Sequence, residues 1–361
     1  MNSKRLITAF ELIALLSLAN SSSAQVPAAE TGKPFAIPHS ASGAQPITDY
    51  RSPLHLQVGI ISMEGTPWDL EGNFGRMEGY VREAARRRAQ LVIAPEAILD
   101  GYVCGAVPDV TKERMLSIAQ TVPDGTYLVR AAKLCQELGI YLVFGFLEKD
   151  GDELFNSCAL FDPQGYIIAS YRKVNPDNSA FIMPGQKLKT FDTPFGRIGL
   201  LICADRHTVE NFATLGVQGA QIIFLPLDGG GGSKNTGILS QRARDNSCAI
   251  VMANTWSAAI IDWTGDVALE KYETECVSVG RINLASMPPL DNRAQFFERR
   301  PELYGPLTAT SPAGRYFDEN GPTEREEKRR ADWNAKLKEY EMELSRKAKS
   351  AGTPKSAPKR P

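Results

Sequence analysis

The feature that most constrains the fold is a regular alternation of short apolar runs with longer helical patterns. Runs rich in Val, Ile, Leu and Phe predict strands at residues 55–61, 91–94, 141–146, 157–161, 166–170, 198–202, 221–225, 248–253 and 276–281. Apolar residues at helical spacing predict helices at residues 73–89, 126–138, 209–217 and 238–246. Alternation of this kind is typical of an α/β fold, and this number of strands allows two sheets.

Size and composition agree with one large folded unit. The 361 residues are 43% hydrophobic, enough to bury a single large core with segments of different character at both ends. The formal net charge of −1 gives no reason to expect a nucleic-acid partner. The six cysteines do not have the spacing of a small disulfide scaffold, and no metal-site spacing is present.

The first 24 residues have the pattern of a secretory signal peptide. A basic start at Lys4 and Arg5 precedes a mostly apolar run, and small residues precede Gln25. We therefore expect cleavage near Gln25, a periplasmic or secreted mature protein, and no stable membrane insertion after cleavage. The alternative is an N-terminal membrane anchor, although the apolar run is short for a span. Residues 25–53, rich in Pro, Ala, Ser and Gly, are expected to form a linker.

The C-terminal end also differs from the core. Residues 301–346 form an extension in which charges of both signs are dense. Four apolar residues recur there at helical spacing, namely Trp333, Leu337, Tyr340 and Leu344. This predicts an exposed helix that packs one stripe on the core or on a partner subunit. Residues 347–361 are basic and contain Pro, and we expect a disordered tail.

An apolar run at residues 198–202 ends at Cys203 and is followed by polar residues and a helical pattern. This places a thiol at a turn from strand to helix, where the helix N-terminus favours the nucleophilic thiolate. The alternative is a cysteine that only ends a core strand, because free cysteines are among the most buried residues. His207, four residues later, allows a further alternative, a catalytic Cys–His pair.

Two more segments place charged side chains at strand ends. Glu96 follows the run QLVIAP, and because Pro cannot continue a central strand, we expect the carboxylate just beyond the sheet edge. A carboxylate desolvated there can take a proton from a thiol. Lys173 lies in the segment YRKV after the strand at 166–170 and can stabilise an oxyanion. The alternative for Lys173 is a solvated surface charge.

Together, Glu96, Lys173 and Cys203 resemble the nitrilase, or carbon–nitrogen hydrolase, superfamily. The resemblance covers roughly residues 54–284 and rests on an ordered set of segments: FIMPG at 181–185, FDTPFGRIG at 191–199, the turn at Cys203, GAQIIFLP at 219–226, RARDN at 242–246 and IID at 260–262. It implies a four-layer α-β-β-α sandwich in a carbon–nitrogen hydrolase domain at residues 54–300.

The resemblance also implies residue roles. Cys203 is the nucleophile, Glu96 the general base and Lys173 the oxyanion partner. The backbone N–H of Ala204 is the second oxyanion donor. Glu148, in GFLE before LFN, matches a second glutamate with which many members orient the substrate and support the lysine. The alternative for Glu148 is a charged residue at a strand end.

Further expectations concern the pocket and its substrate. Tyr102 and Asn254 are expected to contact the substrate. The Gly-rich segment at 228–234 lacks the residue order of a phosphate-binding loop. The resemblance instead implies a mobile loop beside the active site. The resemblance implies a thiol hydrolase that cleaves a non-peptide amide-type C–N bond, in an amide or N-carbamoyl substrate, through a Cys thioester. It implies no metal or organic cofactor, and a homodimer or higher homo-oligomer.

The residues after the nucleophile favour one branch of the superfamily. Ala204, Asp205, Arg206 and His207 resemble the amidase and carbamoylase branches more than true nitrilases, which usually have Trp-Glu after the cysteine. Two alternatives stay open. One is a nitrilase that acts on nitriles, and the other is a nitrilase-like binding or assembly protein with little turnover.

Overall fold

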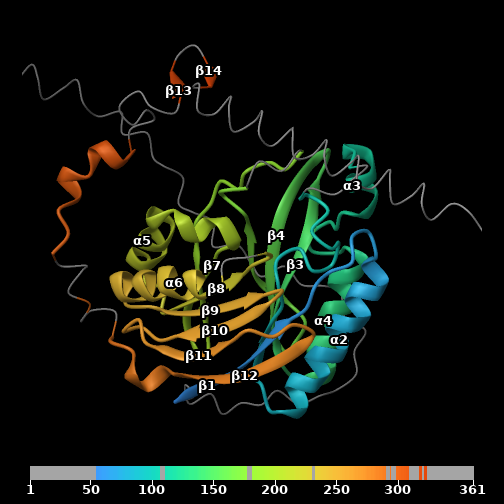
Figure 1. Cartoon of the computed structure of the whole chain (residues 1–361), viewed down its shortest axis with the longest axis horizontal. Helices are drawn as coiled ribbons and strands as arrows, with labels where there is room; N and C mark the ends of the chain where they lie inside the picture. The colour runs from blue at the N-terminus through green and yellow to red at the C-terminus, as the bar shows by residue number, and fades with distance from the viewer. Residues whose placement is uncertain are drawn as a thin grey trace, which may run out of the picture. The chain divides into compact units, whose positions relative to one another are not determined.

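The computed structural model describes residues 54–105, 110–176, 181–229, 232–289, 293, 298–308, 317–318 and 321–322. Within these ranges the chain forms two six-stranded sheets that pack face to face, with helices on the outer face of each sheet (Figure 1). The expected signal peptide and linker, the four apolar residues of the charged helix and the basic tail lie outside the described residues.

The first sheet has the strand order β12-β1-β2-β3-β4-β5. Its strands are β1 (His55–Ser62), β2 (Leu91–Ile93), β3 (Tyr141–Asp150), β4 (Glu153–Phe161), β5 (Ile167–Arg172) and β12 (Cys276–Asn283). The three central strands β1, β2 and β3 are parallel, whereas β4, β5 and β12 pair antiparallel with their neighbours. The parallel centre brings the carboxyl ends of β1, β2 and β3 to one edge.

The second sheet has the order β11-β10-β9-β8-β7-β6. Its strands are β6 (Thr190–Thr193), β7 (Gly196–Leu200), β8 (Ile222–Pro226), β9 (Ala249–Asn254), β10 (Ser257–Ile261) and β11 (Val267–Lys271). Again the centre, β7 to β9, is parallel, and the outer strands are antiparallel. In each sheet the carboxyl ends of the parallel strands therefore lie at one edge, and loops with polar residues follow them there.

Helices cover the outer faces. These are α2 (Leu70–Arg86), α3 (Lys112–Ile118), α4 (Thr126–Leu138), α5 (Val209–Val217) and α6 (Ser233–Asn246). Phe74 of α2 and Leu128 of α4 share a buried cluster with Phe144 of the first sheet. Leu215 of α5 and Leu239 of α6 share another with the second sheet. That second cluster also contains inward-facing residues of the first sheet, so the sheets pack on each other and the expected four-layer α-β-β-α sandwich is confirmed.

The remaining short elements are the 3-10 helices η1 (Cys203–His207), η2 (Leu284–Ser286), η4 (Pro301–Leu303) and η5 (Gly305–Thr308), and the strand pair β13 (Phe317–Asp318) and β14 (Gly321–Pro322).

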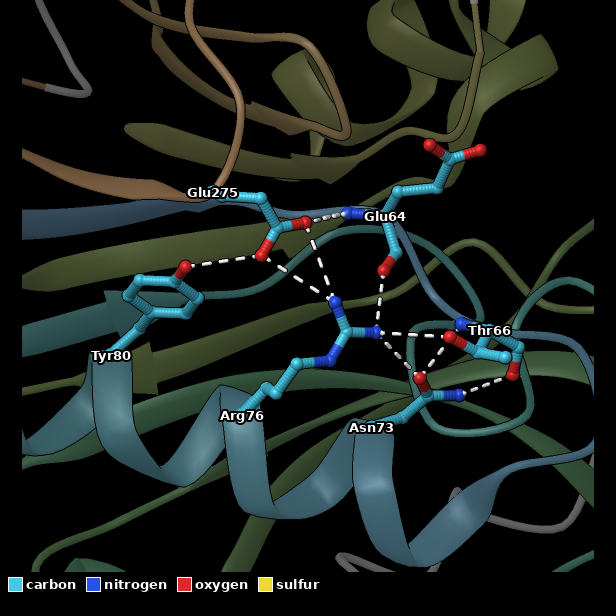
Figure 2. Close-up of polar contacts among 6 residues, drawn as sticks. All are labelled: Glu64, Thr66, Asn73, Arg76, Tyr80 and Glu275. Carbon is cyan, nitrogen blue, oxygen red and sulfur yellow. Dashed lines mark hydrogen bonds and ion pairs between the residues drawn. The ribbon is translucent and has the colours of Figure 1, made fainter. Parts of the chain in front are cut away.

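A polar network anchors α2 to the loops beside it (Figure 2). The Arg76 guanidinium donates to the Glu64 carbonyl at 2.8 Å and to Asn73 Oδ1 at 2.9 Å. Glu275, before β12, accepts from the Glu64 amide and from the Tyr80 hydroxyl, each at 3.1 Å. The network joins the loop after β1, the exposed side of α2 and the turn before β12.

Candidate active site

Glu96, Lys173 and Cys203 lie close together, where the carboxyl ends of the parallel strands of the two sheets come together. Glu96 follows β2, Lys173 follows β5, and Cys203 begins η1 shortly after β7. Their exposed fractions are 2%, 1% and 6%, so all three side chains are withdrawn from bulk water. The alternative of a solvated surface lysine is therefore wrong for Lys173.

The Glu96 carboxylate is held by three donors. Its Oε1 accepts from Lys173 Nζ and from Asn156 Nδ2, each at 2.8 Å. Its Oε2 accepts from the backbone N–H of Asp228 at 2.9 Å. An ion pair combined with two hydrogen bonds satisfies a buried charge and fixes its orientation. Glu96 is thus a rigidly placed proton acceptor.

The Cys203 thiol lies within reach of this carboxylate. Its backbone has φ of 43°, a left-handed conformation that a non-glycine residue rarely adopts and that often occurs at functional turns. Sγ lies 3.7 Å from the carbonyl oxygen of Asp228 and 3.3 Å from Nη1 of Arg206. The strained turn therefore presents the thiol between a carboxylate, a carbonyl and a guanidinium.

Burial, and then the negative charge of Glu96, raise the pKa of Cys203 to about 12, although Lys173 and Arg206 act in the opposite direction. A hydrogen bond to Glu96 also raises this pKa. The expectation that the helix N-terminus lowers the thiol pKa is thus wrong. The resting thiol is protonated at neutral pH, and it needs a base to become a nucleophile.

Asp205 fixes the shape of the turn that carries Cys203. Its fully buried carboxylate accepts from the Ile202 amide at 2.9 Å, from the Tyr171 hydroxyl at 2.7 Å and from the Asn175 amide at 2.9 Å. Burial raises the pKa of Asp205 to about 6, against the lowering effect of these hydrogen bonds. Asp205 is one of the four residues that resemble the amidase and carbamoylase branches, and in this chain it holds the turn after β7 in place.

Ala204 and His207 occupy the same short helix as Cys203. Ala204 lies in its first turn, where backbone N–H groups have no partner within a helix, as the expected oxyanion donor requires. The His207 side chain is exposed, whereas Cys203 is buried. The group that contacts the thiol as a base is Glu96, so the alternative Cys–His pair is wrong.

Glu148 does not join this group. Strands β3 and β4 pair with Leu147 opposite Asn156 and Glu148 opposite Phe155, and successive side chains of a strand face opposite sides. Since Asn156 points to Glu96, Glu148 faces the outer side of the sheet. There it accepts from Ser157 Oγ and Arg172 Nη2, each at 2.5 Å. The expectation that Glu148 supports Lys173 is corrected by this alternation.

The two expected substrate-contacting residues have different environments. Asn254 is 1% exposed and uses both ends of its amide, donating to the Gly229 carbonyl at 2.9 Å and accepting from the Thr255 amide at 2.9 Å. It clamps the loop after β8 and has no free group for a substrate, so that expectation is corrected. Tyr102 is half-buried, with its ring beside the cluster of Val103 and its neighbours, and its substrate contact stays a prediction.

Two residues of the site were missed by the sequence analysis, Asn156 and Asp228. Asn156 follows Phe155 in the segment LFN and binds the general base. Asp228 directly follows the apolar run FLPL, and its backbone contacts both Glu96 and Cys203. For Asp228 the available signal was the one that found Glu96, a polar residue just after a buried strand, whereas Asn156 lies inside β4, where no such signal marks it.

Burial, and then the charge of Glu96, raise the pKa of Asp228 to about 7. All six cysteines are free thiols. In the described ranges, no group of three or more His, Cys, Asp and Glu residues is arranged to hold a metal ion. Across the same part of the chain, none of the helices combines the length and the apolar character that a membrane span requires.

The profile of the carbon–nitrogen hydrolase family matches residues 57–290. The chain belongs to this family and is a carbon–nitrogen hydrolase of the nitrilase superfamily, as the sequence resemblance implied.

Named relatives lie within the same superfamily. The chain is 32% identical to a nitrilase of Pyrococcus abyssi over 174 residues, 47% of this chain and 64% of that protein. It is 27% identical to the human omega-amidase NIT2 over 262 residues, 64% of this chain and 91% of that protein.

Solved structures share the fold. A double mutant of the amidase from Nesterenkonia sp. AN1 in complex with acrylamide has a TM-score of 0.58 at 21% identity, over 73% of this chain and 98% of that one. The NitFhit protein of C. elegans has a TM-score of 0.60 at 22% identity, over 69% of this chain and 66% of that one.

Proposed function

We propose that this protein hydrolyses the C–N bond of small-molecule amides or N-carbamoyl compounds through a thioester on Cys203. The observation that carries the proposal is the contact of a protonated, buried thiol with a carboxylate that is itself fixed by Lys173 and Asn156. The family and the names of relatives such as omega-amidase NIT2 support the amide class.

The first half of the reaction forms the thioester. Glu96 takes the proton from Cys203 Sγ as the sulfur attacks the carbonyl carbon. The oxyanion that develops is stabilised by the Lys173 ammonium and by the backbone N–H of Ala204. Glu96 then gives its proton to the leaving nitrogen, the C–N bond breaks, and ammonia or an amine departs.

The second half regenerates the enzyme. Water enters the place of the departed nitrogen, Glu96 takes one of its protons, and the hydroxide oxygen attacks the thioester carbon. The same oxyanion donors act again, and Glu96 returns the proton to the sulfur as the C–S bond breaks. The products are a carboxylic or carbamic acid and the free thiol, so each turnover consumes one water.

The decisive experiment measures ammonia release from primary amides, N-carbamoyl amino acids and nitriles, together with intact mass. Wild-type protein is expected to turn over at least one amide-type substrate faster than its nitrile counterpart and to carry an acyl adduct on Cys203 during turnover. Cys203→Ala should be inactive and free of adduct. Cys135→Ala is a matched control, because Cys135 is another buried thiol and lies on α4, away from the site.

Turnover in Cys203→Ala would contradict the thioester mechanism. A substrate preference for nitriles would instead favour the nitrilase alternative, and the absence of turnover with all three classes would favour a binding role.

We further propose that the mature protein is periplasmic or secreted and forms a homodimer or higher oligomer. The basis for export is the signal-peptide pattern in residues 1–24. The intact mass of protein recovered from its native compartment tests cleavage near Gln25, and light scattering tests assembly.

A further inference from the structure

The side-chain oxygen of Asn156 is a buried acceptor that has no hydrogen-bond partner among the residues that the structure describes. The residue is 3% exposed, so this oxygen is not satisfied by bulk water. Leaving a buried acceptor unpaired costs about 1–3 kcal/mol, and most buried polar atoms in proteins are therefore paired. An unpaired acceptor beside the general base has the chemistry to receive a donor from a ligand.

The orientation of this amide is fixed by its neighbour. Asn156 Nδ2 donates to Glu96 Oε1 at 2.8 Å. Exchanging nitrogen and oxygen would place an amide oxygen against a carboxylate, with two acceptors facing each other and no proton between them. The donor end therefore belongs to Glu96, and the acceptor end is the one left for a ligand.

The backbone of Asn156 is fixed as well. Its carbonyl oxygen accepts from the Lys173 amide at 2.8 Å, while Lys173 Nζ binds the same Glu96 oxygen that Asn156 binds. One residue of β4 thus contacts both the general base and the strand end that carries the oxyanion partner. Its acceptor is held rigidly beside the carboxylate that exchanges protons with the substrate.

We propose that Asn156 Oδ1 accepts an N–H of the leaving nitrogen, and that the substrate class is amides that carry at least one hydrogen on that nitrogen. This inference rests on the proposed function. The leaving nitrogen must reach the Glu96 carboxylate to be protonated, and Asn156 is bonded to that carboxylate. An acceptor at this position meets the nitrogen at the moment when its C–N bond breaks.

The hydrogen bond is stronger in the transition state than in the ground state. In a planar amide the nitrogen is neutral, whereas in the tetrahedral intermediate the proton from Glu96 leaves a positive charge on it. A charged donor makes a stronger hydrogen bond, so the Asn156 acceptor lowers the barrier to C–N cleavage. An ester offers no N–H at this position and gains nothing from the acceptor.

The test compares the amide that wild-type protein cleaves best with the methyl ester of the same acid. Asn156→Ala should lower kcat/KM for both substrates, because Glu96 loses a donor. It should lower the amide-to-ester ratio of kcat/KM by a further factor of about ten to a hundred, from the lost charge-assisted hydrogen bond. Asn156→Asp retains an oxygen acceptor of the same size and should keep the ratio within about threefold of wild type, despite a lower overall rate.

Asn73→Ala is the matched control. Asn73 is a fully buried asparagine that bonds Thr66 and Leu99 in the network of Figure 2, so its loss lowers stability without touching the site. Its amide-to-ester ratio should equal that of wild type. If Asn156→Ala does not fold, Asn156→Ser, whose hydroxyl is too short to replace the lost acceptor, takes its place.

An unchanged amide-to-ester ratio in folded Asn156→Ala or Asn156→Ser would overturn the inference, because the orphan oxygen would then bind only water. Wild-type protein that cleaves no amide at all would overturn the proposed function instead, so the two failures are distinguishable.

Discussion

The hydroxyl of Tyr171 donates to the carboxylate of Asp205 at 2.7 Å, and this bond joins the two sheets beside the nucleophile. Tyr171 belongs to β5 of the first sheet, and Asp205 to η1 after β7 of the second. The Tyr171 oxygen also accepts from the Val174 amide at 3.2 Å. The contact therefore couples the segment that carries Lys173 to the turn that carries Cys203.

Removing this bond should damage both stability and turnover. Tyr171→Phe leaves a buried carboxylate without one donor, so we expect a loss of about 1–3 kcal/mol in the free energy of unfolding. We also expect kcat to fall more than KM rises, because Lys173 and Cys203 are no longer held at one separation. Urea unfolding and steady-state kinetics measure the two effects.

Tyr80→Phe is the control for this substitution, because the Tyr80 hydroxyl bonds a carboxylate, Glu275, on the exposed side of α2. It should change both quantities much less. Equal losses in the two variants would show that the bond between the sheets has no special role.

The ion pair of Glu96 and Lys173 should be strongly coupled. Both side chains are fully buried, and their charged atoms are 2.8 Å apart. Lys173→Met leaves the carboxylate buried without its counterion, and we expect a loss of about 3–5 kcal/mol in stability. The double variant with Glu96→Gln removes both charges and should recover much of that stability while staying inactive. Additive losses in the double-mutant cycle would contradict this coupling.

The raised pKa of Cys203 gives a spectroscopic prediction. With a pKa of about 12, the thiol should show no thiolate absorbance near neutral pH. The ultraviolet difference between wild type and Cys203→Ala should stay flat from about pH 6 to about pH 9. A step in that range would mean that the resting enzyme already holds a thiolate and that Glu96 is not needed to generate it.

The sequence predicted the bounds of two helices correctly, but it did not predict the lengths of several strands. Helices α4 and α5 have the predicted bounds, since each carries a clear apolar stripe and a definite end, Gly139 at the C-cap of α4 in left-handed conformation among them. The strands β3 and β4 are longer than predicted, because their hairpin continues through charged residues that interrupt the apolar runs. Strands β6, β10 and β11 were not predicted, and the exposed strand β11 lacks the apolar run on which the prediction relied.

Among the residues expected in the candidate site, those that follow buried strands were predicted correctly, whereas Glu148 and Asn254 were not. Glu96, Lys173 and Cys203 follow buried runs, so the sequence places them at sheet edges and the structure brings them together. Glu148 lies within a strand, where a shift of one residue changes the face, and no local pattern fixes that register. Asn254 failed for another reason: its partners, Gly229 and Thr255, are set by loop conformations that the sequence does not specify.

The carboxyl of Asp228 predicts how stability depends on pH. Its pKa is raised to about 7, whereas an aspartate in an unfolded chain titrates near about 4. Between these values the folded protein holds a proton that the unfolded chain has lost. The contribution of the Asp228 carboxyl to the stability of the folded protein is therefore complete below about pH 4 and is lost as pH rises through about 7.

Asp228→Asn replaces this titrating carboxyl with an amide that binds no proton. The fall in unfolding free energy between about pH 5 and pH 7 should become shallower by at most about 1.4 kcal/mol per pH unit. Asp100 and Asp205, whose pKa values burial also raises, remain in both proteins. Chemical denaturation at several pH values gives the two slopes, and a steeper slope in Asp228→Asn would contradict the assignment.

Glu148 provides the sharpest test of which sheet face carries the chemistry. The family resemblance assigns it to catalysis, whereas the structure turns its carboxylate outward, against Ser157 and Arg172. Glu148→Gln keeps the size of the side chain and removes the charge that pairs with Arg172. If the carboxylate of Glu148 faces outward and takes no part in catalysis, the free energy of unfolding should fall by about 1–3 kcal/mol and kcat should stay within about threefold of wild type.

Glu96→Gln, the same substitution at the inward-facing carboxylate, should lower kcat by at least about a hundredfold, because a general base contributes that much. Steady-state kinetics and urea unfolding of the two variants compare them directly. A loss of kcat in Glu148→Gln as large as in Glu96→Gln, without a loss of stability, would place Glu148 in the catalytic machinery and contradict its outward orientation.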